Sequence, residues 1–156
     1  MILLDSWKTP FGLAPFDKIS DAEFAPAIDK ALEVALAGIS KIADNPEVLS
    51  FENTIEAMEV AEALLDQVAA VFYTLAGCDS TAVREALQRE FSPKLSAYSS
   101  AVSSNKKLFE RIQTLWANRE AHDLSTEQER VLMLAHRGFV RAGAQLSGAD
   151  ADRMAE

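Results

Sequence analysis

The chain has 156 residues, enough for one domain with its own hydrophobic core. Fifteen basic and 24 acidic residues give a net charge of −9, which disfavours nucleic acid as a partner because phosphates repel an acidic surface. The chain is 49% hydrophobic and 25% charged, as in soluble globular proteins, and its six glycines and five prolines are too few for a turn-rich all-β protein.

The first 19 residues differ in character from the rest. Aromatic residues alternate there with helix breakers: Trp7, Pro10, Phe11, Gly12, Pro15 and Phe16. Prolines hold a chain extended, and large rings need a surface to pack on. We therefore expect residues 1–19 to form an extended arm that lies across helices, and residues 20–156 to form a helical domain.

The first helix is predicted to begin at the capping box Ser20-Asp21-Ala22-Glu23 and to stop before Asn45-Pro46. Its apolar residues recur at steps of three and four, which places them on one buried stripe. The stripe consists of Phe24, Ile28, Ala31, Leu32, Ala35, Ile39 and Ile42.

The second helix is predicted from Ser50 to Gly77, with Gly77 as a left-handed cap. Its expected buried stripe is Phe51, Ile55, Met58, Leu65, Val68, Phe72 and Leu75. Its expected water-facing residues are Glu52, Glu56, Glu59 and Glu62.

The third helix is predicted to be capped by Asp79 or Ser80 and to kink near Pro93, whose ring removes one backbone donor. Its expected buried residues are Val83, Leu87, Phe91, Leu95, Tyr98 and Val102.

Two shorter helices follow, one capped by Asn105 and one opened by a capping box from Ser125 to Gln128. Their expected buried residues are Leu108, Phe109, Ile112, Leu115, Trp116, Val131, Leu132, Leu134, Ala135 and Phe139. A further helix is predicted from Ser147, and because it reaches Glu156 without a stop signal, we expect a chain truncated at its C-terminus. Short loops between helices favour an all-α, up-and-down bundle of antiparallel hairpins.

The sequence gives no support for export or membrane insertion. Residues 1–5 lack a basic region and a long apolar run, and the most apolar stretch, Val68–Cys78, is too short to cross a bilayer. Cys78 is the single cysteine, so no internal disulfide forms. We expect a cytoplasmic protein.

No residue of the chain is predicted to be catalytic, cofactor-binding or metal-binding. The two histidines, His122 and His136, lie fourteen residues apart, so they do not form a His-Glu-x-x-His zinc helix, and neither has a Glu three residues before it as a di-iron bundle needs. The spacing Gly138 to Gly143 matches a phosphate loop but lacks its lysine and hydroxyl residue, and we assign Gly143 to a bend or close helix contact. Cys78 has no neighbouring base, and the serines from Ser96 to Ser104 are assigned to packing or surface.

Three segments resemble the start of the thimet-oligopeptidase family of zinc metallopeptidases, which includes oligopeptidase A and peptidyl-dipeptidases. They are the arm with Leu3-Leu4, Trp7, Thr9-Pro10-Phe11-Gly12-Leu13 and Pro15-Phe16-Asp17-Lys18-Ile19, leading to Phe24 and Pro26-Ala27; the segment Phe51-Glu52-Asn53-Thr54-Ile55; and the segment Arg137-Gly138-Phe139-Val140-Arg141-Ala142-Gly143-Ala144 with Leu146.

The resemblance implies a longer enzyme with a helical shell around a channel that admits short peptides. The family's zinc motif is absent from these 156 residues, so the resemblance implies an inactive segment of the shell whose zinc belongs to a catalytic domain elsewhere in the parent chain. It also implies that separation from the parent uncovers apolar surface and permits self-association. The alternative is an independent helical module that binds partner proteins without catalysis.

Overall fold

A computed structural model describes residues 1–146 and residue 153. These residues form α-helices and short helical turns without a β-strand, which confirms the predicted all-α fold. The helices are α1 (Phe24–Ala43), α2 (Ala57–Cys78), α3 (Ala82–Ser103), α4 (Lys106–Ala117) and α5 (Thr126–Arg141). The helix predicted from Ser147 lies outside the described residues.

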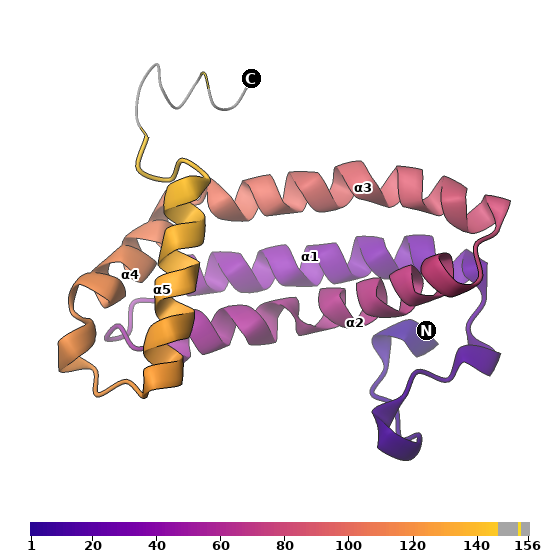
Figure 1. Cartoon of the computed structure of the whole chain (residues 1–156), viewed down its shortest axis with the longest axis horizontal. Helices are drawn as coiled ribbons and strands as arrows, with labels where there is room; N and C mark the ends of the chain where they lie inside the picture. Colours follow the sequence, from indigo (N-terminus) through magenta and orange to yellow (C-terminus); the bar gives the residue numbers. More distant parts are fainter. Residues whose placement is uncertain (147–152, 154–156) are drawn as a thin grey trace. The chain divides into compact units, whose positions relative to one another are not determined.

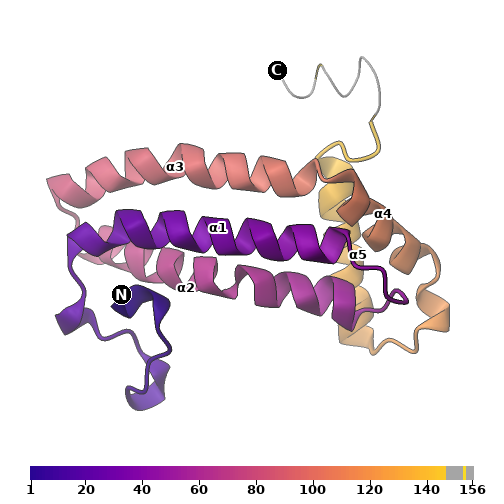
Figure 2. The same ribbon diagram turned by 180° about the vertical axis from the view of Figure 1, so that it is seen from behind.

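The chain divides into two compact units. The first unit comprises Met1–Ala37 and Ala61–Tyr98, and the second comprises Gly38–Val60 and the residues from Ser99 onward. Within the first unit, the parts of α1, α2 and α3 that belong to it lie side by side (Figures 1 and 2). This arrangement is the helical bundle that the short loops predict.

Three phenylalanine rings form the centre of the first unit. The Phe72 ring meets those of Phe24 and Phe91 edge to face, with centroids 5.1 Å and 4.8 Å away, and all three side chains are fully buried. Each ring comes from a different helix and was expected on a buried stripe. The prediction that Val83 of α3 is buried was wrong, because its side chain is 56% exposed.

The arm is not a continuous extended segment. It contains three 3₁₀ turns, Ile2–Leu4, Pro10–Gly12 and Phe16–Lys18. Its fully buried residue is Leu3, whose carbonyl accepts a 2.9 Å hydrogen bond from Gln67 Nε2 of α2. The expectation that the aromatic rings pack on a surface was wrong for Phe11, which is 99% exposed. A buried aliphatic side chain and a hydrogen bond from a side chain of α2 to a carbonyl of the arm therefore attach the arm.

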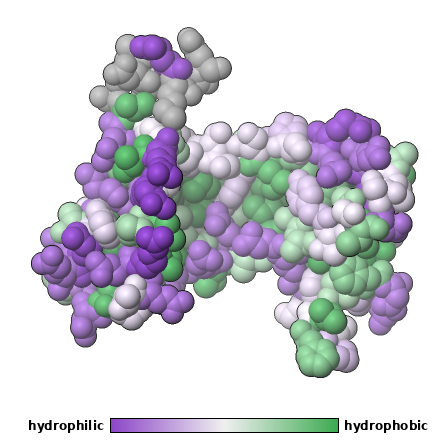
Figure 3. Space-filling view, viewed as in Figure 1, coloured by the Kyte–Doolittle hydropathy of each residue, from purple (hydrophilic) through white to green (hydrophobic). Residues whose placement is uncertain are grey.

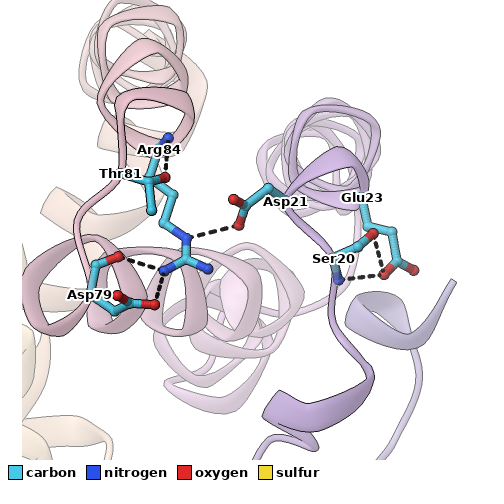
Figure 4. A network of polar contacts seen from close by, with 6 residues as sticks. All are labelled: Ser20, Asp21, Glu23, Asp79, Thr81 and Arg84. Carbon is cyan, nitrogen blue, oxygen red and sulfur yellow. Dashed lines mark hydrogen bonds and ion pairs between the residues drawn. The ribbon is translucent and has the colours of Figure 1, made fainter.

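A network of polar contacts joins the start of α3 to the turn before α1 (Figure 4). The Ser20 N–H donates to Glu23 Oε2 at 3.0 Å, which confirms the capping box. Arg84 Nε donates to Asp21 Oδ1 at 2.8 Å, although Arg84 and Asp21 are 63 residues apart. The α3 cap is Thr81, whose Oγ1 accepts from the Arg84 N–H; it is neither Asp79 nor Ser80, because the helix begins later than expected.

Two helix features differ from the sequence prediction. Gly77 lies inside α2 without a left-handed backbone, so it does not provide the predicted cap. Glu62 does not simply face water: its Oε1 accepts a 2.6 Å hydrogen bond from the hydroxyl of Tyr98. Burial and this carboxylate raise the pKa of Tyr98 above its ordinary value. Pro93 lies inside α3, which continues as a helix from Ala82 to Ser103; the kink stays a prediction.

One helical run in the described part of the chain, Glu52–Cys78, is long and apolar enough to cross a membrane by length and composition alone. This run is longer than the stretch Val68–Cys78 singled out from the sequence, because it also includes the turn Glu52–Glu56 and the first half of α2. Of the apolar window in this run, 28% is buried, and the buried residues of α2 are Leu65, Val68, Val71, Phe72 and Ala76.

In the second unit, α4 and α5 pack together and both have the predicted caps. Asn105 accepts a 3.1 Å hydrogen bond from the Leu108 N–H, and the capping box of Ser125 and Gln128 is complete. The buried residues of the two helices are Leu108, Phe109, Ile112, Leu115, Leu132 and Phe139. Val131 and Leu134, expected to be buried, are 36% and 40% exposed.

Helix α5 ends in a Schellman motif. Gly143 has a φ of +85°, and the N–H groups of Gly143 and Ala144 donate to the carbonyls of Val140 and Phe139. This 5→2 and 6→1 pattern requires a left-handed residue at the position of Gly143. The motif confirms that Gly143 forms a bend.

Candidate functional site

The segment Phe51-Glu52-Asn53-Thr54-Ile55 overlaps a single π-helical turn, Glu52–Glu56, that leads into α2. The carbonyl of Phe51 accepts from the N–H groups of Ile55 at 2.7 Å and Glu56 at 3.2 Å, so the turn is widened by one residue. Such turns are rare and recur at functional sites, because they rotate the side chains on either side. Here the turn buries Phe51, Thr54 and Ile55.

Arg111 of α4 binds this turn through neutral acceptors. Its Nη2 donates to Asn53 Oδ1 at 2.9 Å and to Thr54 Oγ1 at 3.3 Å, and its Nη1 donates to the carbonyl of Asn45 at 2.8 Å. Asn53 in turn binds Ser50 and Val48. We call these residues, Asn45, Val48, Ser50, Asn53, Thr54 and Arg111, the Arg111 cluster.

The Arg111 cluster was not predicted from the sequence. The bonds that Arg111 donates join residues 57 to 66 positions apart, and helix periodicity does not address such pairs. Two signals could have indicated it: Thr54 is a hydroxyl residue between the buried Phe51 and Ile55, and Arg111 precedes the buried Ile112. Arg111 Nε is buried and has no hydrogen-bond partner among the described residues. The cluster fixes the loop before α2 and contains no nucleophile paired with a base.

His136 of α5 lies against aromatic rings of α4. Its ring is stacked on Trp116 with centroids 5.7 Å apart and on Phe109 at 6.0 Å. Burial lowers the pKa of His136, since a desolvated imidazole favours its neutral form. Arg119 covers the Trp116 ring at 4.3 Å, a cation–π contact. This histidine therefore acts as a packing residue.

The other residues considered from the sequence are dispersed. Cys78 is exposed at the end of α2, and His122 is partly exposed in the turn after α4. The pKa of Glu52 is lowered by hydrogen bonds to its own backbone N–H and to the Ser50 hydroxyl, and by the nearby His122. Among residues 1–146, no group of three or more His, Cys, Asp or Glu side chains is placed to hold a metal.

A cavity of about 420 Å³ lies in the second unit where α3 gives way to α4. Its lining includes Ser100, Ser103 and Ser104, the α4 cap Asn105, and the Gly143 bend after α5. Part of the serine-rich segment assigned to packing or surface therefore lines a cavity. Small side chains and backbone form most of this lining, which brings together no acid, base and nucleophile.

No family model matches the chain. It is 33% identical over 152 residues to a dipeptidyl carboxypeptidase of Salmonella typhimurium, a match that covers 97% of this chain and 22% of the relative. A dipeptidyl carboxypeptidase of Escherichia coli is 35% identical over 139 residues, covering 88% of this chain and 20% of the relative. Oligopeptidase A of Escherichia coli is 27% identical over 139 residues, covering 88% of this chain and 20% of that protein.

The chain thus spans about a fifth of the length of the curated relatives that it matches. These relatives are named as peptidases and cover nearly the whole chain, so they support the resemblance to oligopeptidases drawn from the sequence motifs.

Proposed function

We propose that this chain is a non-catalytic helical segment of a longer zinc-dependent oligopeptidase, in which it forms part of the shell that restricts access to the active-site channel. The observation that carries the proposal is the match of 97% of the chain to only 22% of a dipeptidyl carboxypeptidase. A match of this kind is expected when one segment of a longer enzyme is taken by itself.

The residues of this chain do not fit a zinc site. The sequence has two histidines, fourteen residues apart, and His136 is stacked against the aromatic rings of Phe109 and Trp116. A catalytic zinc needs three protein ligands that converge on one point. The proposal therefore assigns the zinc, its ligands and the general base to the parent polypeptide, where a metal-activated water attacks the peptide bond.

The proposal extends to partners and location. The partner is the catalytic domain of the parent, and the substrates of the parent are short peptides. The apolar side chain of Val60, which is 77% exposed, supports contact with further protein or self-association. We place the parent in the cytoplasm, which the single, unpaired Cys78 supports.

Sequencing and activity assays test the proposal together. We expect the reading frame to continue past residue 156 to a His-Glu-x-x-His sequence, and the full-length product to hydrolyse short peptides in a zinc-dependent manner. The 156-residue chain is expected to show no turnover with or without added zinc. Turnover or tight zinc binding by this chain contradicts the proposal, and a stop codon at residue 157 favours the independent interaction module.

A further inference from the structure

The turn at the tip of the arm has an unusual backbone. The Gly12 N–H donates to the Thr9 carbonyl at 3.0 Å, and the Leu13 N–H donates to the Pro10 carbonyl at 3.4 Å. Phe11 in this turn has a φ of +60° and a ψ of 13°, and Gly12 has a φ of +67°. The left-handed region suits glycine, whereas a bulky residue there is a genuine outlier. Phe11 therefore occupies a position at which glycine is less strained.

The side chain of Phe11 is not covered by the rest of the described chain, so burial does not stabilise it there. It is 99% exposed, and the nearby Leu13 and Phe16 are 61% and 43% exposed. Hydrophobic side chains form the tip of the arm in the space-filling view (Figure 3). An exposed ring on a strained backbone has no compensating contact within its own unit, and such outliers persist where function requires them.

The base of the arm is fixed, so the tip is held in place. Leu3 and Pro15 are buried on either side of the tip. Gln67 Nε2 donates to the carbonyls of Leu3 at 2.9 Å and Asp5 at 3.2 Å, and the Thr9 hydroxyl donates to the Leu13 carbonyl across the turn. A ring presented on an ordered turn loses little conformational entropy when it binds.

We infer that Phe11 is an anchor residue that inserts into an apolar pocket on the remaining part of the parent polypeptide. The inference rests on the proposed function and specifies one contact of this segment. The pocket that receives Phe11 is assigned to the rest of the parent polypeptide, because about four-fifths of the length of the relatives lies outside the region matched by this chain. Aromatic residues, Phe among them, are enriched in protein interfaces relative to the rest of the surface.

Cysteine footprinting tests the inference. Phe11→Cys is made in a Cys78→Ser background, both in the 156-residue chain and in the parent polypeptide encoded by the reading frame that continues past residue 156. The rate of maleimide labelling at position 11 is followed by peptide mass spectrometry. We expect labelling in the parent to be at least about tenfold slower than in the short chain, because the side chain is enclosed. Equal rates overturn the inference.

Val48→Cys in the same background is the matched control, since Val48 is 91% exposed in a loop of the other unit. We expect its labelling rate to change less than about threefold, and equal slowing at both positions overturns a specific role for Phe11. Phe11→Gly gives a second readout: it should leave or raise the melting temperature of the short chain, where strain is relieved, and lower that of the parent. A parent insensitive to Phe11→Gly overturns the inference.

The two proposals fail in different ways. A peptidase parent in which position 11 stays fully reactive contradicts only the role of Phe11. A continuing frame without a zinc motif contradicts the proposed function, while the labelling result still decides whether Phe11 is enclosed. A frame that stops at residue 156 removes the occupant and overturns both.

Discussion

The centre of the first unit consists of the rings of Phe24, Phe72 and Phe91. In the second unit, by contrast, Arg111 and the fully buried Thr54 lie among apolar residues. In the first unit the ion pair of Lys94 and Asp29 is partly open to solvent, with side chains 33% and 57% exposed. Apolar burial is non-directional, but a partly buried guanidinium must have its acceptors in place. The second unit should therefore be more sensitive to the loss of single polar groups.

The largest expected effect is that of Phe72→Ala in the first unit. The substitution removes a fully buried ring that contacts two others, so we expect it to lower the free energy of unfolding by about 3–5 kcal/mol. Urea denaturation followed by circular dichroism measures the loss. Val83→Ala, at a 56% exposed position on α3, is the control and should change stability by less than about 0.5 kcal/mol. Similar losses for both variants contradict the assignment of the core.

Arg111→Met tests the polar character of the second unit. It leaves Asn45, Asn53 and Thr54 without the hydrogen bonds that Arg111 donates, at an expected cost of about 1–3 kcal/mol in unfolding free energy. The exposed Arg137→Met is the control. A double-mutant cycle with Thr54→Val should give a coupling of at least about 0.5 kcal/mol. A stability for Arg111→Met within about 0.5 kcal/mol of the original chain rules out a structural role for the cluster.

Lys94→Met removes a polar group from the first unit, and it should lower the free energy of unfolding less than Arg111→Met does. Lys94 Nζ lies 2.6 Å from Asp29 and 2.9 Å from Glu90, and the two carboxylates raise its pKa. Because these groups are partly open to solvent, we expect a loss of about 0.2–1 kcal/mol that shrinks at 1 M salt. If Lys94→Met lowers the free energy of unfolding more than Arg111→Met does, the second unit is not the one more sensitive to the loss of single polar groups.

At neutral pH the smallest expected effect on the free energy of unfolding is that of replacing His136, and this effect grows as the pH falls. Burial lowers the pKa of His136 in the folded state, so below its unfolded value of about 6.5 the unfolded chain takes up the proton more readily. Stability should therefore fall as the pH decreases from 6.5 toward the lower folded pKa. Unfolding curves between pH 7.5 and pH 5 should show a shallower decline for His136→Phe than for His122→Gln. Identical pH profiles for the two variants contradict this.

Much of the local structure could be predicted because it depends on neighbours in the sequence. Ser20, Asn105 and Ser125 were identified as caps, since a cap needs only a donor two or three residues away. The stripe of α1 is buried except for the half-buried Leu32. Thr81 was missed because Asp79, Ser80 and Thr81 are equivalent by residue type, and only the start of the helix distinguishes them.

The candidate site was less predictable. The sequence drew attention to the segment from Phe51 to Ile55 through its resemblance to a family, but its π-helical geometry and its bonds to Arg111 were not foreseen. Periodicity assigns faces and does not identify the partner of a polar side chain. For the same reason Glu62 was assigned to solvent, although it accepts a hydrogen bond from Tyr98, 36 residues away.

The helical fold, the start of most helices and much of the core could be predicted from residue order alone, because they follow from hydrogen bonds and apolar spacing within a few residues. The sequence does not show that Arg111 and Thr54 lie together, that Leu3 attaches the arm, or that no described segment covers Phe11. Those outcomes depend on which segments, tens of residues apart, meet when the helices pack, and local preferences carry no information about that pairing.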